Sequence, residues 1–292
     1  MIVLYFLSYS NIFIALCAAS LCSFCHLISY NKFPNWVVLG FVFSATLFAY
    51  NFHRRFGQIH QNSSRIKLEK ATSFERKDKW IKHNKALIDW IIVLSFCSSL
   101  ILLYLLPKIT LAIVFPLATL SLLYILQISK VPALRSIPFL KIFIIAFVWG
   151  GVMALLPVLS GSESDRVFTL EWQVLAIAIA LFVFGETIPF DIRDINEDRA
   201  TQLKTIPLKI GLKKSKLLSF ILYILSGMLF VLHILFYNKP LLFAFSFSLS
   251  LSLSLIIILG VNTYKHELYY SLLIESSLAF PFIFYVLLSF LT

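Results

Sequence analysis

The chain has 292 residues, of which 60% are apolar and only 13% are charged. A soluble domain of this size carries roughly 25% charged residues, so the composition excludes a soluble enzyme, a secreted disulfide scaffold and a nucleic-acid-binding protein. The apolar runs, about 20 residues each, match helices that cross a membrane and are too long for the strands of a membrane barrel. The sequence therefore predicts an all-α integral membrane protein surrounded by membrane lipids, with no nucleic-acid partner.

Nine apolar runs predict a bundle of nine transmembrane helices that forms a single domain over residues 1–292. The expected spans are 8–30, 33–52, 86–106, 110–129, 138–159, 170–190, 217–237, 240–263 and 269–291. Of the 25 Lys and Arg residues, 21 lie in segments on one side of this alternation. Because basic segments stay on the cytoplasmic side, we expect a multi-pass protein of the cell's inner or plasma membrane, with the N-terminus cytoplasmic and the C-terminus outside.

Two of the predicted cytoplasmic segments are long and polar. They cover residues 53–85, after the second span, and residues 191–216, after the sixth span. The chain has a net charge of +11, and much of its positive charge lies in these two segments. Such basic segments are suited to anionic lipid headgroups or to anionic ligands.

Three carboxylates begin the second of these segments. Asp191, Asp194 and Asp198 have the spacing i, i+3 and i+7, which predicts one face of a helix. Carboxylates so placed repel each other unless a divalent cation lies among them, and oxygen ligands beside a phosphate-bearing substrate suit Mg²⁺. The alternative is a solvated helix end with mixed charges, which the pair Arg193 and Glu197 at i, i+4 supports.

The residues that follow carry a family resemblance. The acidic run leads into Lys204-Thr-Ile-Pro207 and then Gly211. The pattern Asp-x-x-Asp-x-x-x-Asp, followed by Lys-Thr-x-Pro and a Gly, resembles the second aspartate motif of the UbiA superfamily of intramembrane aromatic prenyltransferases. The predicted topology is similar to that family as well, and so is Pro138-Phe-Leu-Lys141 at the start of the fifth span.

The resemblance implies transfer of an isoprenyl group from an isoprenyl diphosphate to an aromatic or other lipophilic acceptor within the membrane. It also implies that the two long segments cap the site, and that Mg²⁺ holds the diphosphate there. Catalytic and metal-binding roles are expected for Asp191, Asp194 and Asp198. A diphosphate also needs cationic or polar partners, and those expected are Asn51, Arg54, Arg55, Lys141 and Lys204.

The first aspartate motif of the family is absent. Asn51 matches its Asn, but His53, Arg54 and Arg55 follow where carboxylates are expected, and the first acid of the chain is Glu69. One hypothesis is a single metal with an arginine directly on the diphosphate. A second is a catalytically impaired relative that acts as a lipid-binding or assembly protein, and a third is that the arginines only anchor a cytoplasmic helix end.

Three further acids lie inside predicted spans, namely Asp89, Glu186 and Glu275. Acids within a membrane are costly and are often functional. For Asp89 we expect snorkelling or a hydrogen bond to a neighbouring helix, and for Glu186 and Glu275 a polar cavity. These acids also support a transporter as a further functional alternative.

Overall fold

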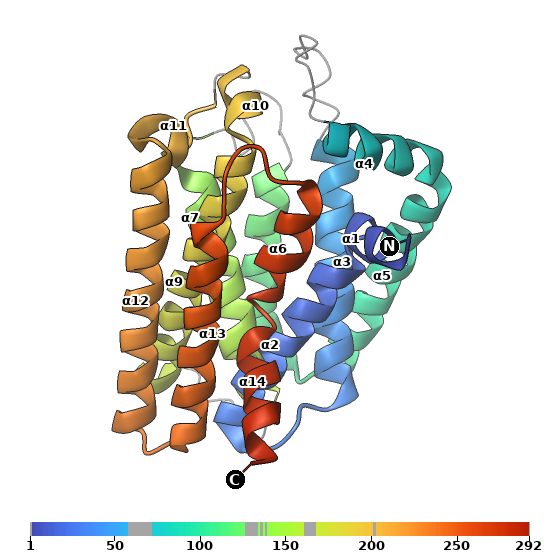
Figure 1. Ribbon diagram of the computed structural model, residues 1–292. Coiled ribbons are helices and arrows are strands. Elements are labelled where there is room, and N and C mark those ends of the chain that lie inside the picture. Colours follow the sequence, from blue (N-terminus) through green and yellow to red (C-terminus); the bar gives the residue numbers. More distant parts are fainter. Residues whose placement is uncertain are drawn as a thin grey trace.

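The computed structural model describes residues 2–57, 72–125, 134, 137, 139–160, 168–200 and 203–291. Those residues form helices and connecting turns, with no strand among them (Figure 1). The helices are α1 (Ile2–Tyr9), α2 (Ile12–Tyr30), α3 (Trp36–Gly57), α4 (Thr72–His83), α5 (Lys85–Leu105), α6 (Leu111–Ile125), α7 (Leu140–Gly150), α8 (Leu156–Leu159), α9 (Leu170–Arg193), α10 (Ile195–Ala200), α11 (Ile206–Ile210), α12 (Leu212–Phe236), α13 (Leu241–Leu259) and α14 (Phe280–Ser289). The predicted all-α class is therefore confirmed for this part of the chain.

Seven helices of the described residues are long and apolar enough to cross a membrane. They are Ile12–Tyr30, Trp36–Phe56, Lys85–Leu105, Leu140–Leu159, Leu170–Arg193, Leu212–Phe236 and Leu241–Leu259. The other two expected spans correspond to shorter apolar helices, Lys108–Tyr124 and Phe280–Ser289. A helix of ten residues is about 15 Å long, half of a typical hydrocarbon core. The π-helical segment Tyr269–Ile274 precedes α14 and extends this last region toward the other end of the bundle.

The first expected span, 8–30, is broken in the structure. Asn11 adopts a left-handed conformation with φ of 61° and separates α1 from α2. Asn enters this region more readily than most residues with a side chain. The break turns α1 out of line with α2 and leaves the Asn11 side chain inside the bundle, where it is buried.

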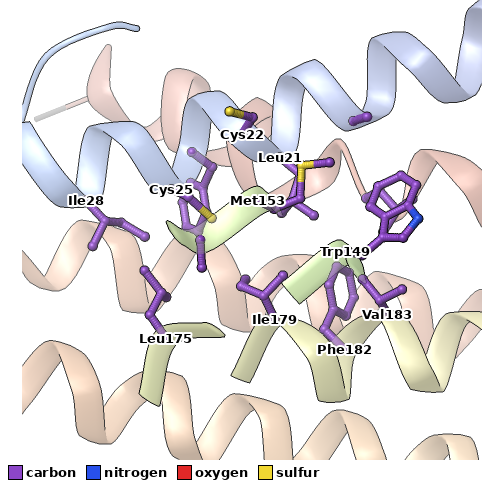
Figure 2. Close-up of a cluster of buried hydrophobic side chains, with 14 of the residues drawn as sticks. Leu21, Cys22, Cys25, Ile28, Trp149, Met153, Leu175, Ile179, Phe182 and Val183 are labelled. Carbon is purple, nitrogen blue, oxygen red and sulfur yellow. The ribbon is translucent and has the colours of Figure 1, made fainter. Parts of the chain in front are cut away.

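The interior of the bundle is apolar. Figure 2 shows Leu21 and Cys25 of α2 facing Met153 and, from α9, Ile179 and Phe182. Many Leu, Ile and Phe side chains are exposed on the outer faces of the same helices. An apolar interior together with an apolar exterior is the arrangement expected where lipid is the solvent.

Two glycines let α7, α9 and α12 approach closely. A Cβ atom on Gly150 of α7 would lie 2.6 Å from the backbone oxygen of Ala176 in α9. A Cβ atom on Gly185 of α9 would lie 2.5 Å from the ring of Tyr223 in α12. Small residues at such contacts allow helices to pack backbone to backbone in membranes. The end of α7 thus packs against the start of α9, and because the two helices run in opposite directions the start of α7 lies at the end of α9, where Lys141 meets Asp191.

The long segments are largely helical where they are described. Residues 53–57 complete α3, α4 follows at Thr72, and the region 191–216 contains the end of α9, α10, α11 and the start of α12. Figure 1 shows α4, α10 and α11 at one end of the bundle and the C-terminus at the other. The ends of helices that lie far apart in sequence thus meet at one polar end.

Candidate functional site

A small cavity lies at the polar end of the bundle, among α7, α9, α10 and α11. Its volume is about 20 Å³, enough for one or two waters or an ion. Two cations, two acids and one threonine line it together with apolar side chains. The lining residues are Ile137, Phe139, Lys141, Ile142, Asp191, Asp198, Leu203, Lys204, Thr205 and Ile206. Four of the residues predicted from the sequence therefore meet at one cavity.

Lys141 and Asp191 form an ion pair across the cavity. The Lys141 Nζ atom lies 2.7 Å from Asp191 Oδ1, with 31% of the Lys141 side chain exposed and only 2% of the Asp191 side chain. Phe139 precedes α7 with φ of 64°, so Lys141 lies in the first turn of α7 and points toward the last turn of α9. A short, charge-assisted bond to a buried carboxylate holds the ammonium at the cavity wall.

Asp198 and Lys204 complete the polar lining of the cavity. Asp198 is buried, whereas Lys204 is exposed. Burial raises the pKa of Asp198 to about 7, the Lys141 ammonium opposes this effect, and the charges of Asp194 and Asp191 add to it. An acid in this state exchanges its proton near neutral pH, so the charge of the cavity responds to what enters it.

The predicted single face of three carboxylates is only partly present. The helix α9 ends at Arg193, a turn at Asp194 follows, and Asp198 belongs to the separate helix α10. Arg193 binds both carboxylate oxygens of Asp194, at 2.6 and 2.9 Å. Asp194 is not among the residues that line the cavity. The bidentate pair therefore holds the third carboxylate beside the cavity rather than in it.

The charges around Asp194 come from several helices. Burial tends to raise its pKa, but the Arg193 charge and hydrogen bonds outweigh this effect, and Lys141 and Lys77 act in the same direction, so the pKa of Asp194 lies below its usual value. Lys77 belongs to α4, in the other half of the chain. The charges of the cavity cation Lys141 and of a cation of α4 thus both favour the ionised form of Asp194.

The carboxylates of the cavity suit a metal that the substrate helps to bind. No group of three or more His, Cys, Asp or Glu side chains in the described ranges is arranged to hold a metal ion. Mg²⁺ is commonly bound by one or two carboxylates together with substrate phosphates, rather than by a full set of protein ligands. Asp191 and Asp198, the two acids that line the cavity, meet this requirement.

Asn51 and Arg54, from the end of α3, are bonded within the protein. Asn51 is fully buried, accepts a hydrogen bond from Asn11 at 3.0 Å and donates to the carbonyls of Ser10 and Leu47, each at 2.9 Å. Arg54 donates to the carbonyl of Tyr9 and, at 2.5 Å, to the side chain of Asn11. These bonds tie α3 to the break between α1 and α2, and neither residue lines the cavity.

Arg55 points to a different helix. Its Nε atom lies 3.1 Å from Asp89 Oδ1 in α5, and its guanidinium lies over the ring of Phe56 at 5.7 Å. This contact bears out the expected interhelical hydrogen bond for Asp89. The structure therefore separates Arg54 and Arg55 from the cavity that holds Lys141 and Lys204.

The UbiA prenyltransferase family model matches residues 78–286 of the chain. The chain belongs to this family. None of the curated proteins matches it. A solved UbiA homologue from Aeropyrum pernix K1 is 16% identical, with a TM-score of 0.63 over 94% of this chain and 97% of that one. A structure described as digeranylgeranylglyceryl phosphate synthase in membranes is 17% identical, with a TM-score of 0.58 over 97% of this chain and 96% of that one.

In this UbiA family member, the intramembrane acid Glu186 has a hydrogen-bond partner within the protein. Glu186 is buried and accepts a hydrogen bond from the Tyr223 hydroxyl. Glu275 follows the π-helical segment Tyr269–Ile274 and interacts electrostatically with Glu186. Neither acid lines the cavity among α7, α9, α10 and α11, and the expected polar cavity around them stays a prediction. Glu186 belongs to the packed interior, whereas Glu275 is half-buried.

Two residues that the sequence pattern does not single out are turned inward in this family member. Asn11 supports both Asn51 and Arg54, and the signal for it was an isolated amide at the edge of an apolar run. Glu267 is fully buried and pairs with Lys77 of α4. No local pattern distinguishes this acid from a solvated one, because its partner lies in a distant part of the chain.

Proposed function

We propose that this UbiA family member transfers an isoprenyl group from an isoprenyl diphosphate to an aromatic or other lipophilic acceptor within the membrane. The observation that carries the proposal is the cavity that places Lys141 and Lys204 beside Asp191 and Asp198. A diphosphate leaving group needs cations at the position where its negative charge grows. The two lysines supply them at the polar end of an apolar bundle, where the isoprenyl chain remains among apolar side chains or lipid.

Each charged group of the cavity has a separate role in this proposal. Lys141, held by Asp191, is a positioned donor to the diphosphate, and the exposed Lys204 completes the contact when the donor enters. The bond between the allylic carbon and the diphosphate oxygen breaks, and the electron pair leaves with the diphosphate. The lysine ammonium groups stabilise that charge without reorganisation of solvent. The apolar surroundings exclude water from the allylic cation.

Divalent-metal dependence, which is general in the family, is part of the proposal. A bound Mg²⁺ would neutralise charge on the departing diphosphate. Asp191 and Asp198 would hold it, since both line the cavity, and Asp194 contributes its negative charge from beside the cavity. The acids of the second motif would thus hold a metal together with the diphosphate.

We further propose the membrane topology predicted from the sequence. In this topology the two shorter apolar helices, Lys108–Tyr124 and Phe280–Ser289, complete a nine-helix domain over residues 1–292 in an inner or plasma membrane. The end that carries α4, α10 and α11 faces the cytoplasm together with the N-terminus, and the C-terminus lies outside. The concentration of Lys and Arg at the former end supports this orientation.

The second candidate function is a non-catalytic lipid-binding or assembly protein. The observation in its favour is the engagement of Asn51 and Arg54 in bonds within the protein, at the position where the family resemblance calls for a first acidic motif. Such a protein would bind an isoprenyl diphosphate or another anionic lipid without turning it over. Binding and turnover therefore separate the two candidates.

The test is a transfer assay on the purified full chain in detergent or liposomes. Radiolabelled isoprenyl diphosphates are offered together with an aromatic acceptor mixture, with and without Mg²⁺, and apolar products are extracted. We expect a labelled product that is lost in Asp198→Asn and kept in Glu197→Gln, a matched change at an exposed acid of the same helix. Binding of the donor without product would favour the non-catalytic candidate, and neither binding nor product would contradict both.

A further inference from the structure

Phe139 has an unusual backbone conformation for its residue type. Its φ is 64°, in the left-handed region, and the other described residues with a side chain in this region are Asn11, Asn31 and Asn238. Asn enters this region more readily than other residues, whereas a bulky side chain is strained there. A phenylalanine in this conformation therefore indicates that its side chain is needed at this place.

The local structure of α7 does not explain the residue. Phe139 is the N-cap of α7, and its side chain makes no capping hydrogen bond. This position favours Asn, Asp, Ser or Thr, because their side-chain oxygens bond with the free N–H groups of the first turn. Phenylalanine offers neither the capping oxygen nor the favoured conformation, so its role lies in what the ring contacts.

The Phe139 ring lines the cavity on its apolar side. The wall has a polar part, which contains the lysines and acids already described, and an apolar part formed by Ile137, Phe139, Ile142, Leu203 and Ile206. Among these lining residues Phe139 is the one aromatic side chain. An inorganic anion has use only for the polar part, whereas an alkylated anion contacts both parts.

Lys209 of α11 holds the ring from outside the cavity lining. Its Nζ atom lies 4.9 Å from the centroid of the Phe139 ring. Lys209 is exposed, so its ammonium remains hydrated while it attracts the ring. Ile206, three positions earlier in α11, lines the cavity, and residues three apart are neighbours on a helix. The same short helix thus supplies part of the apolar wall and fixes the aromatic ring beside it.

We propose that Phe139 is the specificity-determining residue of this cavity and makes it select an alkyl diphosphate over inorganic pyrophosphate. The isoprene unit next to the diphosphate packs on the Phe139 ring, and Lys209 is a positioning residue that acts through the ring. No covalent bond changes in this binding step. The inference rests on the proposed function, because it takes the ligand to be an isoprenyl diphosphate.

The proposed transfer gives this selection a purpose. When the isoprenyl group moves to the acceptor, the diphosphate that remains is inorganic pyrophosphate. Donor and released product then share the anionic group that the lysines bind, and they differ in the alkyl chain. A contact with the chain is therefore needed to bind the donor in preference to the product, and Phe139 provides an apolar surface next to the cations.

The proposal is tested by the affinities of the purified full chain for geranyl diphosphate and for inorganic pyrophosphate, measured by calorimetry in detergent with Mg²⁺. We expect the unmodified protein to bind geranyl diphosphate more tightly. Phe139→Gly removes the ring and suits the left-handed backbone. It should bind geranyl diphosphate about tenfold more weakly and pyrophosphate as before. Phe139→Tyr keeps the ring and should keep the preference.

Two further variants control for the ring and for the cation. Phe56→Ala removes a ring that also lies beside a cation, with Arg55 at 5.7 Å, but that does not line the cavity, so both affinities should stay unchanged. Lys209→Met should weaken geranyl diphosphate binding by about threefold and leave pyrophosphate binding unchanged. Equal weakening of both ligands in Lys209→Met would make this lysine an anion contact and overturn its positioning role.

The ratio of the two affinities decides the proposal. An equal loss of both affinities in Phe139→Gly would show a structural role, and unchanged affinities would show that the ring does not contact the chain; either result overturns the proposal. Equal binding of both ligands by the unmodified protein would overturn it as well. If Phe139→Gly does not fold, Lys209→Met decides by the same ratio. The expected ratios without product in the transfer assay would support Phe139 and contradict the proposed transfer.

Discussion

Two polar regions meet at one end of the bundle, and they differ in how their groups are satisfied. Around the end of α3, Asn51 and Arg54 bond with the side chain of Asn11 and with backbone carbonyls. Around the ends of α7 and α9, Lys141 and Asp191 bond with each other but still border a cavity, with Lys204 exposed beside it. Both regions were predicted to bind the same diphosphate.

The difference follows from the residues at the end of α3, where arginines stand in place of carboxylates. Without carboxylates near Asn51, the arginine that follows stabilises the break between α1 and α2 instead of facing a metal. The region around the ends of α7 and α9 contains a cavity because its carboxylates and lysines come from separate helices that meet there. A polar cluster closed by its own bonds stabilises the fold, whereas one that borders a cavity is accessible to a ligand.

The largest effect is expected from breaking the ion pair of the cavity. Lys141→Met leaves Asp191 as a buried charge without its partner, which costs about 3–5 kcal/mol, so a large loss of thermal stability is expected together with loss of donor binding. Adding Asp191→Leu to this variant should restore most of the stability and none of the binding. Thermal unfolding in detergent measures the first effect, with Lys213→Met as the exposed control. Equal stability in Lys141→Met and Lys213→Met would show that the pair is not formed.

A smaller loss of stability is expected at the closed cluster, without loss of binding. Asn51→Leu leaves the Asn11 amide and the Ser10 carbonyl without their partner, at about 1–3 kcal/mol for each buried group. The variant should unfold at lower temperature than Asn196→Leu, a change at an exposed residue of α10. Its affinity for geranyl diphosphate should equal that of the unmodified protein. A tenfold weaker affinity would place Asn51 in the binding site and remove the contrast between the two regions.

The fold class and the part of the candidate site between Asp191 and Lys204 could be predicted from the sequence for physical reasons. Apolar length predicts membrane helices, and the run from Asp191 to Lys204 is local enough for its chemistry to be seen in one segment. The spacing of the three carboxylates predicts one continuous helix through Asp194, and this prediction was wrong. The helix α9 ends at Arg193, and a turn follows at Asp194, whose carboxylate pairs with Arg193.

The remaining features depend on contacts that no local pattern encodes. The inward turn of Lys77 is set by Tyr5, Tyr9 and Trp80, and its partner Glu267 is nearly two hundred positions away. Arg54 and Arg55 are adjacent in sequence, yet they point to α1 and to α5. Which helix each arginine contacts depends on how the helices pack against one another.

The smallest effect is expected at Arg55. Its pair with Asp89 is partly exposed, with 34% and 45% of the two side chains accessible, and such pairs contribute about 0–1 kcal/mol. Arg55→Met should therefore lower the melting temperature slightly and leave the affinity for geranyl diphosphate unchanged. Weaker binding in this variant would show that Arg55 contacts the diphosphate and that the site extends across both halves of the bundle.

The most direct test of the central claim is the affinity of the full chain for geranyl diphosphate before and after Lys204→Met. Lys204 is exposed and lines the cavity, so its replacement should alter ligand binding without altering the fold. With Mg²⁺ present, we predict micromolar or tighter binding by the unmodified protein and at least about tenfold weaker binding by Lys204→Met, while Lys213→Met binds normally. Equal affinities in all three proteins, or no binding in any of them, would contradict the assignment of this cavity to the diphosphate.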